Sequence, residues 1–130
     1  MSARSFLLIG LLSMLVAVVL GAFGAHGLRA VVTPERLQTW QTATEYHFIH
    51  ALGLIALAVW MEGKSSSRLV QLCGLLLIAG VLLFSGSLYL LVLADTAMLG
   101  IITPFGGLCF IAAWACWFIA AWKSRPPMQN

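Results

Sequence analysis

Residues 5–25, SFLLIGLLSMLVAVVLGAFGA, contain no charged side chain. A transmembrane helix needs about 20 mostly apolar residues, so this stretch is long enough to cross a bilayer. It ends in small residues, and GAFGAHGL at 21–28 combines little side-chain volume with one titratable ring. The stretch therefore predicts a membrane helix whose last turns leave room for a neighbouring helix.

The composition of the whole chain supports a membrane location. Hydrophobic residues make up 62% of the 130 residues and charged residues 8%, against about 25% charged residues in ordinary globular proteins. A soluble fold of this size would lack the polar side chains to cover its surface. The net charge of +3 comes without a basic run or a basic face, so nothing indicates nucleic-acid binding.

Four apolar stretches predict an all-α membrane protein, a compact antiparallel bundle of four transmembrane helices in a single domain, 1–130. The predicted spans cover about 5–25, 44–61, 69–93 and 104–122. An alternative for the first stretch is a cleaved signal peptide, because Arg4, an apolar core and small residues at GAFGA fit that pattern loosely.

The connection between the first two spans contains a helix start. Thr33 suits an N-cap, Pro34 the first helical position, and Glu35 the positive end of the helix dipole. A helix from Pro34 through Met61 would be about 42 Å long, more than the hydrocarbon layer of about 30 Å. We therefore expect a short interfacial helical segment before the second span. Thr103-Pro104 repeats the start signal before the fourth span.

The basic residues predict the orientation. If both termini share one side, that side holds Arg4, Lys64, Arg68, Lys123 and Arg125, and the other side holds Arg29 and Arg36. Positive residues favour the cytoplasmic side, so five against two place both termini in the cytoplasm. For a bacterial protein this means a multi-pass protein of the inner (cytoplasmic) membrane.

Catalytic chemistry has little support in the sequence. The chain has no nucleophile paired with a base, no pair of deep carboxylates and no phosphate-binding glycine loop. Cys73, Cys109 and Cys116 lie in apolar runs without zinc-ligand spacing. We expect no enzymatic activity and no cofactor.

Small residues indicate where helices approach each other. The predicted helix-packing motif consists of Gly21, Gly24, Gly27, Gly106 and Gly107. The simplest interpretation is tight packing inside one bundle. The alternative is that one small-residue stripe forms the interface of a homo-oligomer or binds a membrane-protein partner.

Polar residues of the spans gather in the half of the bundle that is predicted to be outer. The candidate polar cluster comprises His26, Glu45, Tyr46, His50, Ser85, Ser87, Tyr89 and Thr103. Ionisable groups at this depth are costly, so they usually face protein or trapped water and have partners. We expect His26 to face His50 and the 85–89 region, and Glu45 to pair with Arg29 or Arg36.

Three interpretations of the histidines remain open. His26 and His50 can form hydrogen bonds between helices, with help from Ser85 or Ser87. They can instead form a proton-linked or small-solute site, since histidine titrates near neutral pH. A metal site would use His47 and His50, spaced i, i+3, with Glu45, but this spacing alone is a weak signal and no metal is expected.

Several motifs resemble those of a known family. LGAFGAHGL (20–28), WQTATEYHFIHAL (40–52), FSGSLYLL (84–91) and ITPFGG (102–107) occur in the order seen in the YgdD/YwdK-like family of small bacterial inner-membrane proteins, which has mitochondrial relatives in animals and is grouped as a domain of unknown function. The resemblance implies four membrane helices and supplies no mechanism. His47 departs from the family pattern, which often has Gln there, and Ile101 departs from a Gly or Pro.

The sequence favours a non-enzymatic membrane protein that acts as a structural or accessory component of the membrane or of a membrane complex. The lipid bilayer is its expected environment. The alternative is a pathway or sensor for protons or a small solute, centred on His26 and His50.

Overall fold

The computed structural model describes residues 1–62 and 67–124 of the chain. Its described residues form helices joined by short turns. The elements are α1 (Ala3–Phe23), η1 (Gly24–Leu28), α2 (Pro34–Met61), α3 (Arg68–Gly80), η2 (Val81–Ser85), α4 (Gly86–Leu93), η3 (Ala97–Ile101) and α5 (Thr103–Lys123). They make four helices long and apolar enough to cross a membrane: Ala3–Leu28, Pro34–Met61, Arg68–Leu93 and Ala97–Lys123.

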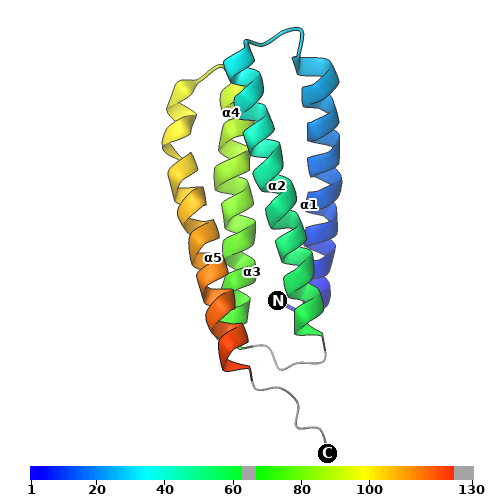
Figure 1. The fold of residues 1–130 in the computed structure, drawn as a ribbon, viewed down its shortest axis with the longest axis vertical. Helices are drawn as coiled ribbons and strands as arrows, with labels where there is room; N and C mark the ends of the chain where they lie inside the picture. The colour runs from blue at the N-terminus through cyan, green and yellow to red at the C-terminus, as the bar shows by residue number, and fades with distance from the viewer. Residues whose placement is uncertain (63–66, 125–130) are drawn as a thin grey trace, which may run out of the picture.

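These helices run up and down in one bundle, as predicted (Figure 1). We name its two ends after Figure 1. The lower end holds the N-terminus, the end of α2, the start of α3 and the end of α5, and the upper end holds the turn from η1 to α2 and the turn from α4 to η3. α1 and α5 lie on opposite flanks, with α2 and α3–α4 between them.

α2 begins where the sequence predicts. The Thr33 side chain accepts a hydrogen bond from the Arg36 backbone N–H at 3.3 Å, and Pro34 occupies the first helical position. α2 then continues without interruption to Met61. The expected interfacial segment is therefore the first part of α2 and not a separate element, because nothing after the N-cap breaks the backbone hydrogen bonding.

Two of the spans contain a π-helical turn, which sequence periodicity did not predict. η1 ends the first span, and η2 joins α3 to α4, with the Gly86 backbone N–H bonded to the Val81 carbonyl. π-turns insert one residue into an α-helix and change the face on which later residues lie. α5 starts at Thr103, so Ile102 and not Thr103 is the N-cap residue, and no side-chain hydrogen bond caps this helix.

α2 is the least apolar span and also the most buried. Half of the residues in an 18-residue apolar stretch of α2 are buried, compared with 17% in the corresponding stretches of the spans that contain α1 and α5. In a bilayer the exposed faces meet lipid, so the more polar helix occupies the interior and the more apolar helices form the flanks.

Two apolar cores hold the bundle together. The lower core brings together Phe6, Leu57, Cys73, Leu77 and Phe110 with their neighbours. The upper core is smaller and is built from Leu28, Trp40, Ala43, Tyr89, Leu91 and Val92. Most buried polar side chains lie between or beside these cores, and they form the site described below.

The predicted glycines are in close contact with neighbours to different degrees. A Cβ at Gly24 would overlap the Trp40 indole, and one at Gly106 would overlap the backbone of Phe84. A Cβ at Gly21 would lie 3.2 Å from the Thr44 methyl group. Around Gly27 the closest group is the Phe23 ring one turn earlier, and around Gly107 a Cβ would make only ordinary contacts. Gly24 and Gly106 are therefore the tightest of these helix contacts.

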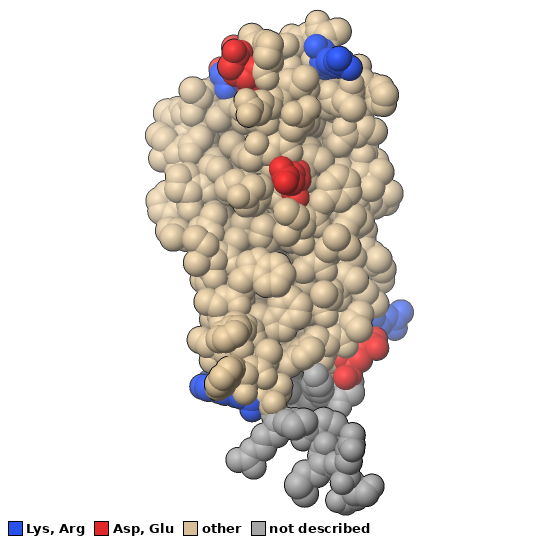
Figure 2. Space-filling model, viewed as in Figure 1, with Lys and Arg blue, Asp and Glu red and all other residues tan. Residues whose placement is uncertain are grey.

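Charged side chains lie mainly at the two ends of the bundle, with an acidic group between them on the visible face (Figure 2). Arg36 Nη2 lies 2.7 Å from Asp95 Oδ1, which joins the start of α2 to the turn after α4. The expected pairing of Arg36 with Glu45 is wrong, since Asp95 comes closer to Arg36 across the upper turns. Lys64 and Arg125, used above for orientation, lie outside the described residues.

Candidate functional site

A series of hydrogen bonds runs from the upper part of the bundle to its middle and joins α2 to α4 and α1. The Thr44 hydroxyl donates to the Trp40 backbone carbonyl at 2.9 Å, and the Tyr89 hydroxyl donates to Thr44 Oγ1 at 3.4 Å. His47 Nδ1 lies 3.2 Å from the Tyr89 oxygen, and His47 Nε2 lies 2.9 Å from Ser13 Oγ. Three helices are tied together by one histidine ring.

The order of donors fixes the tautomer of a neutral His47 ring. Tyr89 has one hydroxyl hydrogen, which it donates to Thr44, so Tyr89 accepts from His47 Nδ1–H. His47 Nε2 then carries a lone pair and accepts the hydrogen of Ser13. Each group in this series of hydrogen bonds therefore donates to the next one. Ser13 is the first donor and accepts no hydrogen bond within the series, so its oxygen lone pairs stay free.

Trp40 locks α2 to α1 above this series of hydrogen bonds. Its indole Nε1–H donates to the Leu20 carbonyl at 2.8 Å, and its ring occupies the space that Gly24 leaves open. The same ring packs against Tyr89, with ring centroids 4.6 Å apart. The glycine and the aromatic ring together explain why α1 loses its side-chain volume near its end.

His50 lies one turn below His47 and is held differently. Its Nδ1 donates to the Tyr46 carbonyl at 2.7 Å, and its ring stacks on Phe110 with centroids 3.4 Å apart and planes 11° apart. A carbonyl can only accept, so the hydrogen of a neutral ring sits on Nδ1. His50 Nε2 is then a lone-pair acceptor, and it has no hydrogen-bond partner in the part of the chain that the structure describes.

The two serines of the predicted cluster differ, because Ser87 has a side-chain hydrogen-bond partner and Ser85 has none among the described residues. Ser87 Oγ lies 2.8 Å from Thr103 Oγ1, which links α4 to the start of α5. Ser85, in η2, is fully buried, and its hydroxyl has no partner among the described residues.

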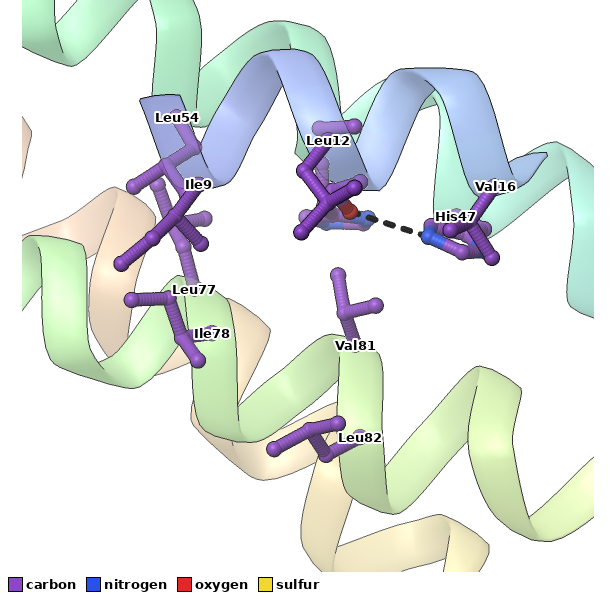
Figure 3. Close-up of a pocket in the computed structure, with 12 residues that line it drawn as sticks. Ile9, Leu12, Val16, His47, Leu54, Leu77, Ile78, Val81 and Leu82 are labelled. Atoms are coloured by element: carbon purple, nitrogen blue, oxygen red, sulfur yellow. Dashed lines mark hydrogen bonds between the residues drawn. The ribbon is translucent and has the colours of Figure 1, made fainter. Parts of the chain in front are cut away.

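A cleft of about 240 Å³ opens between α1, α2 and the α3–η2 helix (Figure 3). Leu12 lies on one wall, and Leu77 and Val81 lie on the facing wall. Ser13, His47 and His50 are the polar side chains that line it, and the dashed bond to His47 in Figure 3 is the one from Ser13. Near the lower end the Phe6 ring meets Gly74, so α1 and α3 come together below the cleft.

The predicted polar cluster is therefore only partly assembled. Tyr89, Ser87 and Thr103 lie in the interhelical contacts, and His50 lines the cleft. Tyr46 is 40% exposed and stacks on Phe84, with ring centroids 4.5 Å apart. Glu45 is exposed on α2.

The expectation that His26 faces His50 is wrong. His26 is exposed, and none of the hydrogen bonds among residues 1–62 and 67–124 includes it. The physical reason is depth: His26 lies two residues before the end of η1, whereas His50 lies 16 residues after the start of α2, about 24 Å below the upper end. His47 provides the contact between α1 and α2 that was expected of His26.

The metal interpretation gains no support from the geometry. Among the described residues no three His, Cys, Asp or Glu side chains come together as ligands. His47 uses both ring nitrogens in hydrogen bonds, and Glu45 points to the surface.

Sequence reasoning missed the bond between Ser13 and His47. No local pattern singles out Ser13, and His47 stands out only as a weak metal candidate and as a departure from the family pattern. A depth argument could have found the bond. Ser13 lies 15 residues before the end of η1 and His47 lies 13 residues after the start of α2, so both sit about 20 Å below the upper end.

Comparisons with known proteins place the chain in a family. The model of the family described as "Protein of unknown function (DUF423)" matches residues 20–107. The chain is 45% identical over 120 residues to the UPF0382 membrane protein YwdK of Bacillus subtilis, which covers 92% of this chain and 98% of YwdK. It is 43% identical over 120 residues to the UPF0382 membrane protein SAB0533 of Staphylococcus aureus, which covers 92% of this chain and 97% of that protein.

No solved structure matches the chain. The resemblance inferred from the motifs is confirmed by the family model and by these relatives. The chain belongs to the DUF423 family and is an integral membrane protein of unknown biochemical role.

Proposed function

We propose that the protein is a non-enzymatic component of the bacterial inner membrane that serves a structural or accessory role there. One observation carries the proposal: three buried polar side chains of α2 form hydrogen bonds to α1 and α4. His47, Thr44 and Trp40 all have protein partners within the bundle. A catalytic residue would instead present its reactive atom to a substrate.

The orientation that we propose puts the lower end in the cytoplasm, with both termini. Among the described residues, Arg4, Arg68 and Lys123 lie at that end and Arg29 and Arg36 at the upper end, and this excess of basic residues supports the orientation. Exposed Trp122, near the end of α5, is the kind of side chain found at membrane interfaces.

A membrane partner or a second copy would contact the lipid-facing sides of the flanking helices. The small-residue stripes are already used inside the chain, since Gly10 and Gly24 pack on α2 and Gly106 packs on η2. α1 and α5 still expose large apolar side chains, such as Leu15 and Phe118. Purification in mild detergent, followed by mass measurement and identification of bound proteins, tests whether such a complex exists.

The competing function, a pathway or sensor for protons or a small solute, draws on the cleft beside His50. His50 lines this cleft, but the residues of α1 that line the cleft extend no closer to the upper end than Val16. Val16 is twelve residues below Leu28, about 18 Å from the upper end. The depth and apolar walls of the cleft favour the accessory role over conduction.

Reconstituted liposomes separate the two functions. We expect the purified protein to carry no proton flux above that of empty liposomes, measured with a trapped pH-sensitive dye under an imposed potential. We also expect His47→Ala to lower the thermal stability in detergent and His26→Ala, at an exposed histidine, to leave it unchanged. A flux that appears with the wild-type protein and disappears with His50→Ala would overturn the proposal.

A further inference from the structure

The cleft has the shape of a small-molecule site that is open to the bilayer. Its volume of about 240 Å³ exceeds that of the engineered cavities of about 150 Å³ that bind benzene. α1 forms one wall and α3 with η2 forms the other, and the two meet below at Phe6 and Gly74. Above the cleft, Trp40 and Tyr89 pack together and close the bundle. A molecule dissolved in the membrane can therefore enter from the side.

The polar groups of the cleft offer acceptors and no donor. The Ser13 hydroxyl donates its hydrogen to His47, so only its oxygen lone pairs are available in the cleft. His50 spends its Nδ1 hydrogen on the Tyr46 carbonyl, which leaves Nε2 as an acceptor. His50 is 5% exposed and lines the cleft, and its Nε2 atom is not among the fully buried unpartnered atoms. An unpaired acceptor in an apolar hollow is costly unless a ligand supplies a hydrogen.

A backbone irregularity lies at the same place. Val81, which lines the cleft, begins the π-turn η2. π-turns inside helices are frequent at functional sites, and they persist because the surrounding structure or the function maintains them. The turn places Val81 and Leu82 against the space that α1 leaves free.

We propose that this cleft binds a small apolar molecule from the bilayer that carries one hydroxyl group, an alcohol or a phenol. The hydroxyl donates to His50 Nε2 beside Ser13, and the apolar body packs between Leu12 and Val81. A charged ligand would lose its hydration against walls that are almost entirely apolar. An ordinary lipid chain would pack against the walls but would leave His50 Nε2 without a hydrogen-bond donor. This site goes beyond the accessory role, and its test does not depend on the flux measurement.

Matched ligands test whether the hydroxyl hydrogen is recognised. The probes are 4-butylphenol, butylbenzene and 4-butylanisole, which have the same apolar body but of which only the phenol can donate a hydrogen bond. Binding is measured to the full chain in lipid nanodiscs, at equal mole fractions of each probe in the membrane. We expect saturable binding of the phenol, at least tenfold tighter than that of the other two, and a shift of the His50 Nε2 signal in a 15N-histidine NMR spectrum.

Two substitutions on α1 test the location. Leu12 and Leu15 are similarly exposed, at 61% and 60%, but only Leu12 lines the cleft. Leu12→Trp is expected to weaken phenol binding at least tenfold, and Leu15→Trp to leave it unchanged. His50→Phe is expected to abolish the preference for the phenol over butylbenzene, with the fold checked by helical content and by the binding of butylbenzene.

Two results would overturn the proposal. If the three probes bind equally, the cleft is only an apolar groove for lipid chains. If Leu12→Trp binds the phenol as tightly as Leu15→Trp does, binding takes place elsewhere on the protein.

Discussion

The contact of α1 with α2 and the contact of α5 with the α3–η2 helix are both close, but different chemistry holds them. In the first, Gly24 makes room for the Trp40 side chain, and hydrogen bonds from Trp40 and Ser13 cross the boundary. In the second, Gly106 lies against the backbone of Phe84, and a hydrogen bond between the Ser87 and Thr103 hydroxyls links α4 to α5.

This difference predicts which change each contact tolerates. Where a glycine faces a side chain, the side chain can move aside, and the loss of a hydrogen-bond partner is the main cost. Where a glycine faces backbone, neither helix can yield without moving as a whole, and an added methyl group is the main cost. The predictions below test this distinction from the largest expected effect to the smallest.

Gly106→Ala is expected to give the largest effect. The new methyl group would overlap the Phe84 backbone nitrogen and lie 2.8 Å from the Leu83 carbonyl carbon. Overpacking against backbone predicts a loss of about 3 kcal/mol in the free energy of unfolding, measured by denaturation in mixed micelles. Gly107→Ala is the control, since its methyl group would come no closer than 3.9 Å to Phe84. Equal losses for the two variants would contradict the backbone-contact account.

Trp40→Phe removes the bond to Leu20 and part of the ring that fills the space beside Gly24. We expect a loss of about 2 kcal/mol in the free energy of unfolding, from one interhelical hydrogen bond and lost packing. Trp122→Phe is the matched control, because Trp122 is 81% exposed and Trp40 is 1% exposed. If both tryptophans tolerate the change, Trp40 does not lock α1 to α2.

The spans were predictable from the sequence, while the site was predictable only in part. The length of an apolar run and the Thr33-Pro34 start are local properties of the chain, so four helices and the beginning of α2 could be predicted. The pairing of His47 with Ser13 depends on how two helices rotate about their own axes. Local patterns do not contain that rotation, and the π-turns alter it further.

His26 and His47 illustrate the point. His26 lies at the upper end of its span and His47 near the middle of α2, and motif resemblance favoured His26. The structure buries His47 and exposes His26, because His47 lies near the middle of α2 beside Ser13 while His26 lies at the upper end of its span. Depth along each helix was a better guide to partners than the conspicuous sequence around GAFGAHGL.

A double-mutant cycle on Ser13 and His47 measures the polar part of the α1–α2 contact directly. Ser13→Ala alone is expected to cost about 0.6 kcal/mol, the average for hydrogen bonds between membrane helices. His47→Ala is expected to cost more, since it also removes the hydrogen bond from His47 Nδ1 to the Tyr89 oxygen. The coupling energy from the four denaturation curves is expected to be about 0.6 kcal/mol. A coupling indistinguishable from zero would show that the bond adds nothing to the contact.

The smallest expected effect has the opposite sign and comes from the backbone-contact side of the molecule. Ser85 is fully buried with an unpartnered hydroxyl, whereas Ser87, two residues later, is bonded to Thr103. Removing an unsatisfied polar atom relieves a desolvation cost, so Ser85→Ala is expected to raise the free energy of unfolding by about 0.5 kcal/mol. Ser87→Ala is expected to lower it by about 0.6 kcal/mol. If Ser85→Ala destabilises the protein as much as Ser87→Ala does, the Ser85 hydroxyl has a hydrogen-bond partner in the membrane. The contact between η2 and α5 would then depend on a hydrogen bond as well as on close packing at Gly106.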